Sequence, residues 1–308
     1  MPTVGPAGEP VVICHGSQAA ALVPLAKLEN RFQAEGLDVA LRHYPSGFQA
    51  LQAMLDGDCA LAAAAVPPVV YQALRRSDFR ILAAISTSGD YERIVVHHDR
   101  GILSPQDLRG RRIAVASATS AHYFLDMFLA ANGLTPGDVT EVYLPAAEVG
   151  AAFLAGTVDA AAHWEPNIRN LVQASGDRAQ VFSFSGLVVS PFLLLTRQGF
   201  AEQASGSVQS ILRALVRAAR SLEEAPASAL RLLAPVYQAS VQEVAFIGSL
   251  HDYSVTLDQP LPFILENAAR WQLGLLPPAE RPPMPDFLDL IDASALRAVK
   301  PQAVSLIN

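Results

Sequence analysis

The 308-residue chain is short of charge, and basic residues are the scarcer kind. Charged residues make up 17% of the sequence and hydrophobic residues 51%, so the chain is far too apolar to be disordered. Lys and Arg total 22 against 29 Asp and Glu, which gives a net charge of -7. A nucleic acid or an anionic membrane surface requires clustered cations, so we expect neither as a partner. A small anion remains possible, because backbone N–H groups can bind it.

Cysteine is also scarce. Cys14 and Cys59 are too few for a disulfide framework or a structural zinc site. Cys14 is expected at the carboxyl end of one strand and Cys59 at the amino end of a parallel neighbour. That arrangement would separate their Cα atoms by more than the roughly 4.4–6.8 Å that a disulfide spans. We therefore predict two free thiols, buried as small apolar side chains.

No apolar run is long enough to cross a bilayer. The longest, residues 60–71, is interrupted by Pro67 and Pro68. The basic start and apolar segment of a secretory signal are not visible either. The sequence is thus compatible with an exported protein whose signal has been removed or with a cytosolic one.

Motifs for metal or nucleotide chemistry are missing too. Gly-rich phosphate loops and Gly-x-Ser-x-Gly elbows do not occur. His97 and His98 are adjacent, so on a strand they would point to opposite faces and could not chelate one metal. We therefore expect no metal and no cofactor. The other histidines lack a recognised metal-ligand spacing: His15, His43, His122, His163 and His251.

Short apolar strands alternate with amphipathic helices through the first two thirds of the chain. Glycines such as Gly57, Gly133 and Gly156 mark the ends of helices. This alternation predicts an α/β fold with parallel strands and right-handed crossovers, followed by a helical C-terminal region. The expected strands are residues 11–14, 37–41, 59–65, 81–85, 93–97, 112–116, 141–144, 158–162 and 192–196. The expected helices are residues 19–33, 48–55, 120–132, 146–155, 207–224, 226–237 and 287–299, with shorter pieces near 262–273.

Four segments carry a family resemblance. They are residues 107–115 (DLRGRRIAV), residues 152–160 (AFLAGTVDA), residues 163–166 (HWEP), and Gly57-Asp58 before an Ala-rich strand. Their order and spacing resemble the alkanesulfonate/nitrate/taurine-binding proteins of ABC transporters, a family that also carries thiamin-precursor pyrimidines. Together the matches extend over about residues 11–197.

The resemblance implies a two-lobed, periplasmic-binding-protein-like (type II) fold with a ligand cleft between the lobes. Residues 10–92 and 192–308 would form the first lobe and residues 93–191 the second, with chain crossings near Val95 and Phe192. It also implies a monomeric, periplasmic solute-binding protein. Such a protein captures a small organic anion or zwitterion, alkanesulfonate or taurine-like, and presents it to an ABC permease. A sensor domain is an alternative partner.

Ligands of open α/β sheets bind beyond the carboxyl ends of the strands, where helix N-termini converge. Four segments of this chain occupy that position. Their N–H groups could surround a sulfonate, nitrate or carboxylate without an Arg, although each Ser or Thr could instead be an ordinary helix cap. The predicted ligand-binding residues of these segments are Gly16, Ser17, Gln18, Ser46, Gly47, Val66, Ser117, Thr119 and Ser120.

Trp164 and Glu165 complete the predicted site. Trp164 could cover the organic part of a ligand, which favours a sulfonate over nitrate. Glu165 could pair with a ligand ammonium, which would favour an amino-sulfonate such as taurine. The alternatives are that Trp164 packs under the hinge and that Glu165 begins a helix, where an acid suits the helix dipole.

Cys14 offers an enzymatic alternative. It ends the first expected strand and precedes His15, and a helix N-terminus could activate a thiolate there. The arrangement resembles a biphenyl desulfinase of related fold, so a Cys14-dependent desulfinase or C–S lyase is the rival hypothesis. The Cys-rich motif of yeast-type pyrimidine synthases is missing, which speaks against that chemistry.

Overall fold

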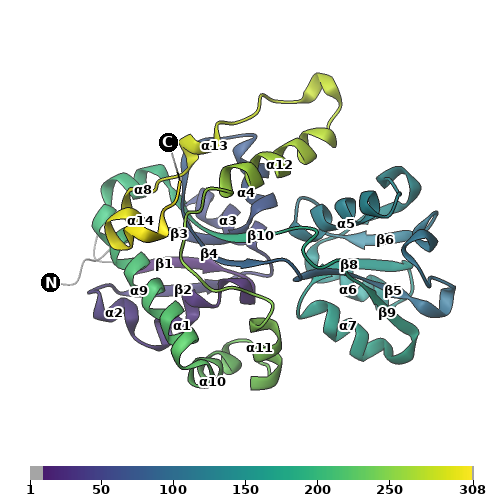
Figure 1. Cartoon of the computed structure of the whole chain (residues 1–308), viewed down its shortest axis with the longest axis horizontal. Coiled ribbons are helices and arrows are strands. Elements are labelled where there is room, and N and C mark those ends of the chain that lie inside the picture. The colour runs from purple at the N-terminus through teal and green to yellow at the C-terminus, as the bar shows by residue number, and fades with distance from the viewer. Residues whose placement is uncertain (1–9, 307–308) are drawn as a thin grey trace. The chain divides into compact units, whose positions relative to one another are not determined.

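The computed structural model describes residues 10–306 and divides the chain into two compact units. The first unit ends at Thr87 and resumes at Pro191, and the second unit is Ser88–Ser190. Each unit is built on its own five-stranded sheet with helices packed on it (Figure 1). The predicted α/β fold of two lobes is confirmed.

The first unit contains the first sheet and most of the helices. Its strands are β1 (Val11–His15), β2 (Val39–His43), β3 (Leu61–Ala65), β4 (Phe79–Ser88) and β10 (Ser190–Arg197). Its α-helices are α1 (Leu22–Leu28), α2 (Arg31–Ala34), α3 (Gly47–Asp56), α4 (Val66–Ala73), α8 (Gln198–Gln203), α9 (Ser205–Glu224), α10 (Pro226–Val236), α11 (Val241–Gly248), α12 (Leu261–Gly274), α13 (Phe287–Leu290) and α14 (Ser294–Val299). Short 3-10 helices are η1 (Gln18–Ala20), η6 (Pro278–Glu280) and η7 (Pro301–Ala303).

The second unit contains the second sheet. Its strands are β5 (Glu92–His97), β6 (Arg112–Val115), β7 (Thr140–Tyr143), β8 (Ala160–Trp164) and β9 (Ala179–Phe182). Its α-helices are α5 (Ser120–Ala131), α6 (Ala146–Leu154) and α7 (Asn167–Ser175). Its 3-10 helices are η2 (His98–Arg100), η3 (Pro105–Leu108), η4 (Pro136–Asp138) and η5 (Gly176–Arg178).

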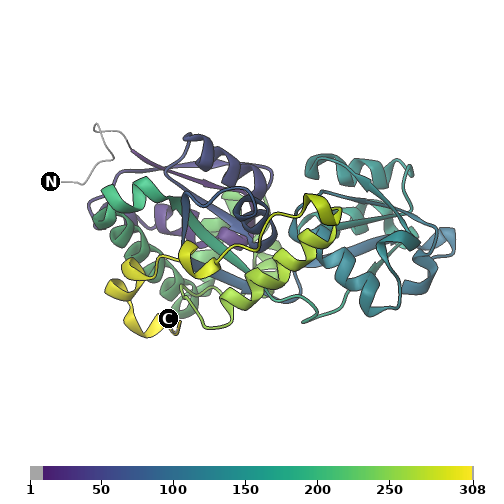
Figure 2. The ribbon, with the colours of Figure 1, turned by 90° about the horizontal axis from the view of Figure 1, so that it is seen from above.

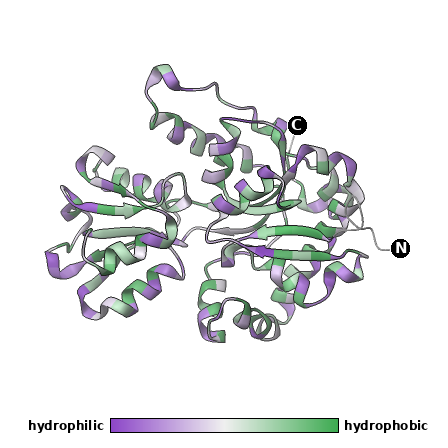
Figure 3. Cartoon of the chain, turned by 180° about the vertical axis from the view of Figure 1, so that it is seen from behind, coloured by the Kyte–Doolittle hydropathy of each residue, from purple (hydrophilic) through white to green (hydrophobic). Residues whose placement is uncertain are grey.

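The first sheet has the strand order β2-β1-β3-β10-β4. As predicted, β1 runs parallel to β2 and β3. Between β3 and β4 lies β10, which is antiparallel to β3 and belongs to the part of the chain after the second unit. Ile13, Leu82 and Leu194 are fully buried in this sheet, and Figure 3 shows its strands in the hydrophobic colour. Helix packing on both faces explains why the central strands β1, β3 and β10 are mostly apolar, whereas β2 at the edge ends in the exposed Arg42 and His43.

The second sheet has the order β7-β6-β8-β5-β9. β6 is parallel to β7 and β8, whereas β5 is antiparallel to β8 and β9. Val95, Phe153 and Ala161 are completely buried in the core of this unit. The chain passes from the first unit to the second at Thr87–Ser88, and Val95 lies within β5 of the second unit. It returns to the first unit at Ser190–Pro191.

Two expected helices are interrupted. Residues 19–33 form η1, α1 and α2, and Asn30 has a left-handed φ of 56° between α1 and α2. Residues 287–299 form the separate helices α13 and α14. In the C-terminal region, α12, yellow-green in Figures 1 and 2, packs on α4. The Gln272 amide donates to the Pro67 carbonyl at 2.7 Å. Among the described residues, no helix is both long and apolar enough to cross a membrane.

Cys14 and Cys59 form a disulfide, so the prediction of two free thiols is wrong. Cys14 lies opposite Ala62 in the register of β1 and β3. A fully extended chain would therefore place Cys59 about 10 Å further along the sheet. β3 begins only at Leu61, and Gly57 before it has a φ of 101°. The turn before β3 folds back, and the two Cα atoms are 5.9 Å apart.

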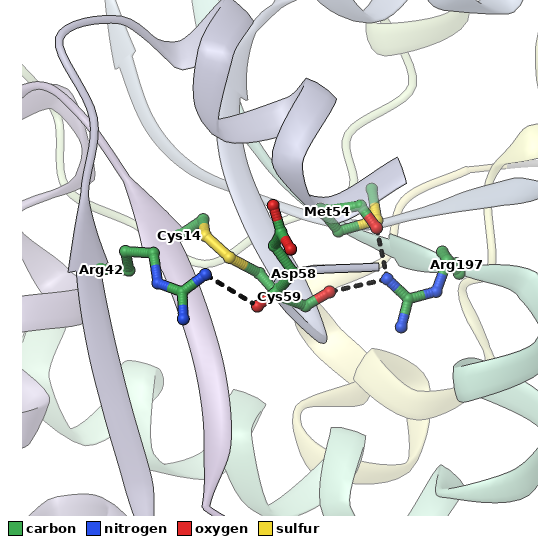
Figure 4. Close-up of a disulfide and its surroundings, with 6 residues drawn as sticks. All are labelled: Cys14, Arg42, Met54, Asp58, Cys59 and Arg197. Carbon is green, nitrogen blue, oxygen red and sulfur yellow. Dashed lines mark hydrogen bonds between the residues drawn. A yellow bond between two sulfur atoms is a disulfide. The ribbon is translucent and has the colours of Figure 1, made fainter. Parts of the chain in front are cut away.

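Two arginines hold this turn in place (Figure 4). Arg42 donates to the Asp58 carbonyl at 3.3 Å. Arg197 of β10 donates to the Cys59 carbonyl at 2.7 Å and also to the Met54 carbonyl. The carbonyls next to the disulfide are thus hydrogen-bonded by side chains from β2 and β10.

Candidate functional site

Three chain segments meet at the carboxyl ends of β1, β2 and β3, and we call them the first half-site. They contain the predicted residues Gly16, Ser17, Gln18, Ser46, Gly47 and Val66. The segments after β1 and β2 are packed so closely that only glycine fits at position 16. A Cβ there would lie 2.8 Å from the Tyr44 carbonyl oxygen and 2.9 Å from the Ser46 carbonyl carbon.

The polar groups of the first half-site are incompletely satisfied. The Ser17 hydroxyl oxygen is buried and has no hydrogen-bond partner among the described residues. Ser46 is the N-cap of α3, where its hydroxyl accepts from the Gln49 N–H at 3.3 Å. A buried hydroxyl without a partner is unfavourable by about 1–3 kcal/mol, and a bound acceptor or donor would relieve this.

Val66 lies at a helix N-terminus that offers few backbone donors. It begins α4, and Pro67 and Pro68 follow it in the first turn. Proline has no backbone N–H, so Val66 is the only one of these three residues with such a donor. The N-terminus of α4 is therefore a weaker anion site than that of α3.

His15 also lies at this edge, at the end of β1. Its side chain is almost fully buried, and its Nδ1 has no hydrogen-bond partner among the described residues. Burial, together with the neighbouring His43, lowers the pKa of His15 to about 4. His15 is therefore neutral at pH 7 and can donate or accept one hydrogen bond. Sequence reasoning considered it as a metal ligand and as the neighbour of Cys14, and did not include it among the ligand-binding residues.

A cavity of about 590 Å³ adjoins the first half-site at Gln18. Its walls come from α9, α10, α11 and residues 251–254, and apolar side chains such as Leu222, Leu233 and Val244 contribute to them. The Tyr253 hydroxyl donates to the Gln18 carbonyl at 2.8 Å at this end. The cavity volume falls within the range of small-molecule sites.

The second half-site lies at the corresponding edge of the second sheet. It contains the predicted residues Ser117, Thr119, Ser120, Trp164 and Glu165. Thr119 is the N-cap of α5, where its hydroxyl accepts from the His122 N–H at 3.4 Å and donates to the Ala116 carbonyl at 2.6 Å. Ser117 is exposed, whereas Thr119 and Ser120 are buried.

Glu92 belongs to this half-site, although sequence reasoning missed it. It begins β5, opposite Trp164 in the register of β5 and β8, and is 5% exposed. Burial raises the pKa of Glu92 to about 7, against the opposing effect of hydrogen bonds from the Ser120 hydroxyl and its own backbone N–H. An acid at the start of an otherwise apolar strand was the signal that could have identified it.

Trp164 and Glu165 are both buried. The Trp164 ring packs edge-on against the neutral His163, with centroids 4.4 Å apart. The Glu165 carboxylate lies 3.1 Å from the Arg93 guanidinium and accepts from the Arg169 backbone N–H at 3.2 Å. Burial nevertheless raises the pKa of Glu165. Glu165 already has a cationic partner in Arg93, whereas the contacts of Glu92 are the Ser120 hydroxyl and its own backbone N–H, so Glu92 is the better placed acid for a ligand cation.

The second unit also contains a cluster of potential metal ligands: His122, Asp126 and Glu141. His122 and Asp126 are four residues apart on α5, and Glu141 comes from β7. The expectation that His122 has no metal-ligand spacing was too narrow, because an i, i+4 pair on a helix shares one face.

The sequence profile of a family described as NMT1/THI5 like matches residues 21–229. The chain belongs to this family. Two curated proteins that it resembles are the taurine-binding periplasmic protein of Escherichia coli (strain K12) and a putative aliphatic sulfonates-binding protein of Bacillus subtilis (strain 168). The first is 28% identical over 199 residues, which cover 63% of this chain and 61% of the relative. The second is 28% identical over 190 residues, which cover 62% and 57%.

The match therefore spans about three fifths of the length of these curated relatives. Among solved structures, the fold is similar to the alkanesulfonate-binding protein SsuA from Xanthomonas axonopodis pv. citri bound to MOPS. That similarity has a TM-score of 0.78 at 24% identity and covers 92% of this chain and 98% of the other. The family resemblance and the type II binding-protein fold inferred from the sequence are both confirmed.

Proposed function

We propose that this protein is a periplasmic solute-binding protein that captures a small organic sulfonate for an ABC permease. The observation that carries the proposal is the first half-site, where the buried Ser17 hydroxyl has no partner among the described residues and the preceding Gly16 packs against Ser46, the N-cap of α3. Helix N-termini and hydroxyls favour an anionic group. The family relatives named for taurine and aliphatic sulfonates support this class of ligand.

The ligand should carry an organic portion. Nitrate would leave the apolar cavity at Gln18 empty, whereas an alkanesulfonate can extend its organic part into such surroundings. Glu92 adds a means of selecting among sulfonates. Its carboxylate could pair with the ammonium group of taurine, which ethanesulfonate lacks.

The disulfide bears on both the compartment and the enzymatic alternative. Disulfides persist in oxidising compartments such as the periplasm, so the pairing of Cys14 with Cys59 supports export. The Cys14 side chain is also fully buried. A desulfinase would need Cys14 as a reactive thiolate, so we propose a binding protein and no enzyme. A Cys14→Ser variant should accordingly retain ligand affinity.

Calorimetry with taurine, ethanesulfonate, longer alkanesulfonates, nitrate, bicarbonate and a pyrimidine tests the proposal. We expect sulfonates to bind and the combined Ser17→Ala, Ser46→Ala and Thr119→Ala variant to lose at least tenfold in affinity. Ser240→Ala and Thr135→Ala remove caps outside both half-sites and should leave affinity unchanged. Tight binding of nitrate or pyrimidine without any sulfonate would overturn the assignment, as would undiminished affinity of the triple variant.

Taurine and ethanesulfonate form a matched pair for Glu92. If its carboxylate pairs with the taurine ammonium, Glu92→Gln should weaken taurine binding by about tenfold or more and leave ethanesulfonate unaffected. Equal losses of affinity for the two ligands would show that Glu92 does not bind the amino group.

A further inference from the structure

His122, Asp126 and Glu141 bring three potential metal-binding atoms together in the second unit. The His122 Nε2 lies 3.3 Å from a Glu141 carboxylate oxygen and 3.8 Å from an Asp126 oxygen. All three ligand atoms lie within 4.8 Å of one another. The Tyr143 hydroxyl lies 3.5 Å from the same Nε2 and also contacts Glu141.

These separations suit a metal ion. Two ligands at 2.0–2.2 Å from a tetrahedral zinc ion are about 3.3–3.6 Å apart. The two distances from the His122 Nε2 are 3.3 and 3.8 Å, so one of them already fits and the other requires a small adjustment. One imidazole with two carboxylates is also a donor set that first-row divalent metals accept.

The burial and the charge of these three side chains also favour a bound cation. The side chains of His122, Asp126 and Glu141 are 1%, 5% and 8% exposed. The second Glu141 oxygen is buried and has no hydrogen-bond partner among the described residues. Two carboxylates so close together in a poorly solvated place repel each other, and a divalent cation would neutralise both. Within the part of the chain that the structure describes, no Arg or Lys forms an ion pair with Asp126 or Glu141.

The orientation of the imidazole has a consequence for binding. The Ala118 N–H donates to the His122 Nδ1 at 3.4 Å, so without metal the imidazole proton is on Nε2. A metal on Nε2 moves this proton to Nδ1, and the long contact with Ala118 is lost. Metal binding should therefore change the tautomer of His122, which NMR of the imidazole nitrogens detects.

We propose that His122, Asp126 and Glu141 form a binding site for a divalent transition metal such as Zn²⁺. Helix α5 supplies two ligands one turn apart, and β7 supplies the third. Tyr143 is 53% exposed and contacts the cluster, so its side provides the route from solvent. A water or the Tyr143 hydroxyl would complete the coordination of the metal.

Equilibrium dialysis of the full chain against Zn²⁺ after treatment with a chelator tests the proposal. We expect one ion per chain, a rise in melting temperature with Zn²⁺, and the visible absorption of tetrahedral Co²⁺ when that ion replaces Zn²⁺. The nitrogen spectrum of His122 should show the proton on Nδ1 in the zinc-loaded protein and on Nε2 in the metal-free protein.

Variants then assign the ligands. Asp126→Asn and Glu141→Gln keep the shapes of the side chains, remove the repulsion, and should each lower zinc affinity at least tenfold. The matched control is Asp99→Asn, because the His97 Nδ1 and the Asp99 carboxylate are also 3.8 Å apart, with a single carboxylate. Asp99→Asn should bind zinc as the unmodified chain does.

Two results would overturn the proposal. One is equal zinc binding by the unmodified chain and the Asp126→Asn, Glu141→Gln double variant, since the ion would then bind elsewhere. The other is an unmodified chain that binds no zinc and keeps its Nε2 tautomer, which would make the cluster a proton-sharing hydrogen-bond network. The spectra of the unmodified chain decide the matter even if a variant fails to fold.

Discussion

Replacing Glu92 with Gln should change how the stability of the protein depends on pH. The Glu92 carboxyl is 5% exposed, and the polar contacts known for it are the Ser120 hydroxyl and its own backbone N–H. Removal from water disfavours the ionised form, so the folded protein holds the proton to higher pH than the unfolded chain does. Gln keeps the size of the side chain and its hydrogen bond to Ser120 while removing the titration.

The sign and size of the effect follow from linkage. Burial raises the pKa of Glu92 from 4.5 to about 7. The folded state therefore binds more protons between these values, and the stability that Glu92 contributes is fully present below pH 4.5 and is lost as the pH rises through 7. A difference of about 2.5 pH units at 1.36 kcal/mol per unit corresponds to about 3 kcal/mol.

Urea unfolding of the unmodified chain and of Glu92→Gln at a series of pH values from 4.5 to 8.5 measures this. The other titrating groups are common to both proteins, so the difference between the two curves isolates Glu92. The unmodified chain should lose about 3 kcal/mol relative to the variant over this range, at most about 1.4 kcal/mol per pH unit. Parallel curves would refute the reasoning and would mean that Glu92 is solvated or paired with a cation.

Three other predictions concern single contacts. Reduction of the Cys14–Cys59 disulfide, which joins residues 45 apart, should lower stability by about 4 kcal/mol in the loop-entropy treatment. Alkylation without reductant after unfolding should modify neither cysteine, and two modified thiols would contradict the pairing. Gly16→Ala should destabilise the protein by about 1–3 kcal/mol, because the new Cβ would lie 2.8 Å from the Tyr44 carbonyl, and an unchanged urea midpoint would count against it. Tyr237→Phe should leave stability within about 1 kcal/mol or raise it, because the Tyr237 hydroxyl is buried without a partner among the described residues; a larger loss would show that the hydroxyl has one.

Local features of the fold could be predicted from the sequence. The apolar run at Val11 forms β1, Gly57 ends α3 with a left-handed φ, and Ser120 begins α5. Each depends on the residue itself and a few neighbours, because helix caps, glycine turns and apolar runs act locally. The same reasoning predicted which edge of each sheet the candidate residues would lie at, because parallel strands end at a common edge.

Long-range features could not be predicted this way. The Cys14–Cys59 pairing depends on a turn that folds back before β3, and an extended strand would have kept the residues apart. Glu92 was overlooked because strand pattern alone does not show which residue meets the N-terminus of α5. The contact of His122 with Glu141 likewise depends on how α5 packs on the second sheet, which no sequence spacing shows.

The position of β10 in the first sheet has a consequence for the order of folding during synthesis. β4 emerges from the ribosome before the whole second unit, yet its neighbour β10 follows that unit. The rest of β4 is bridged by residues made still later, with Thr87 paired to Asp252 and Ile81 to Ile291. Nascent chains that stop before Pro191 contain all of the second sheet and only part of the first. The second unit can therefore fold while the chain is growing, whereas β4 stays without its final neighbours until residues as late as Ile291 have been made.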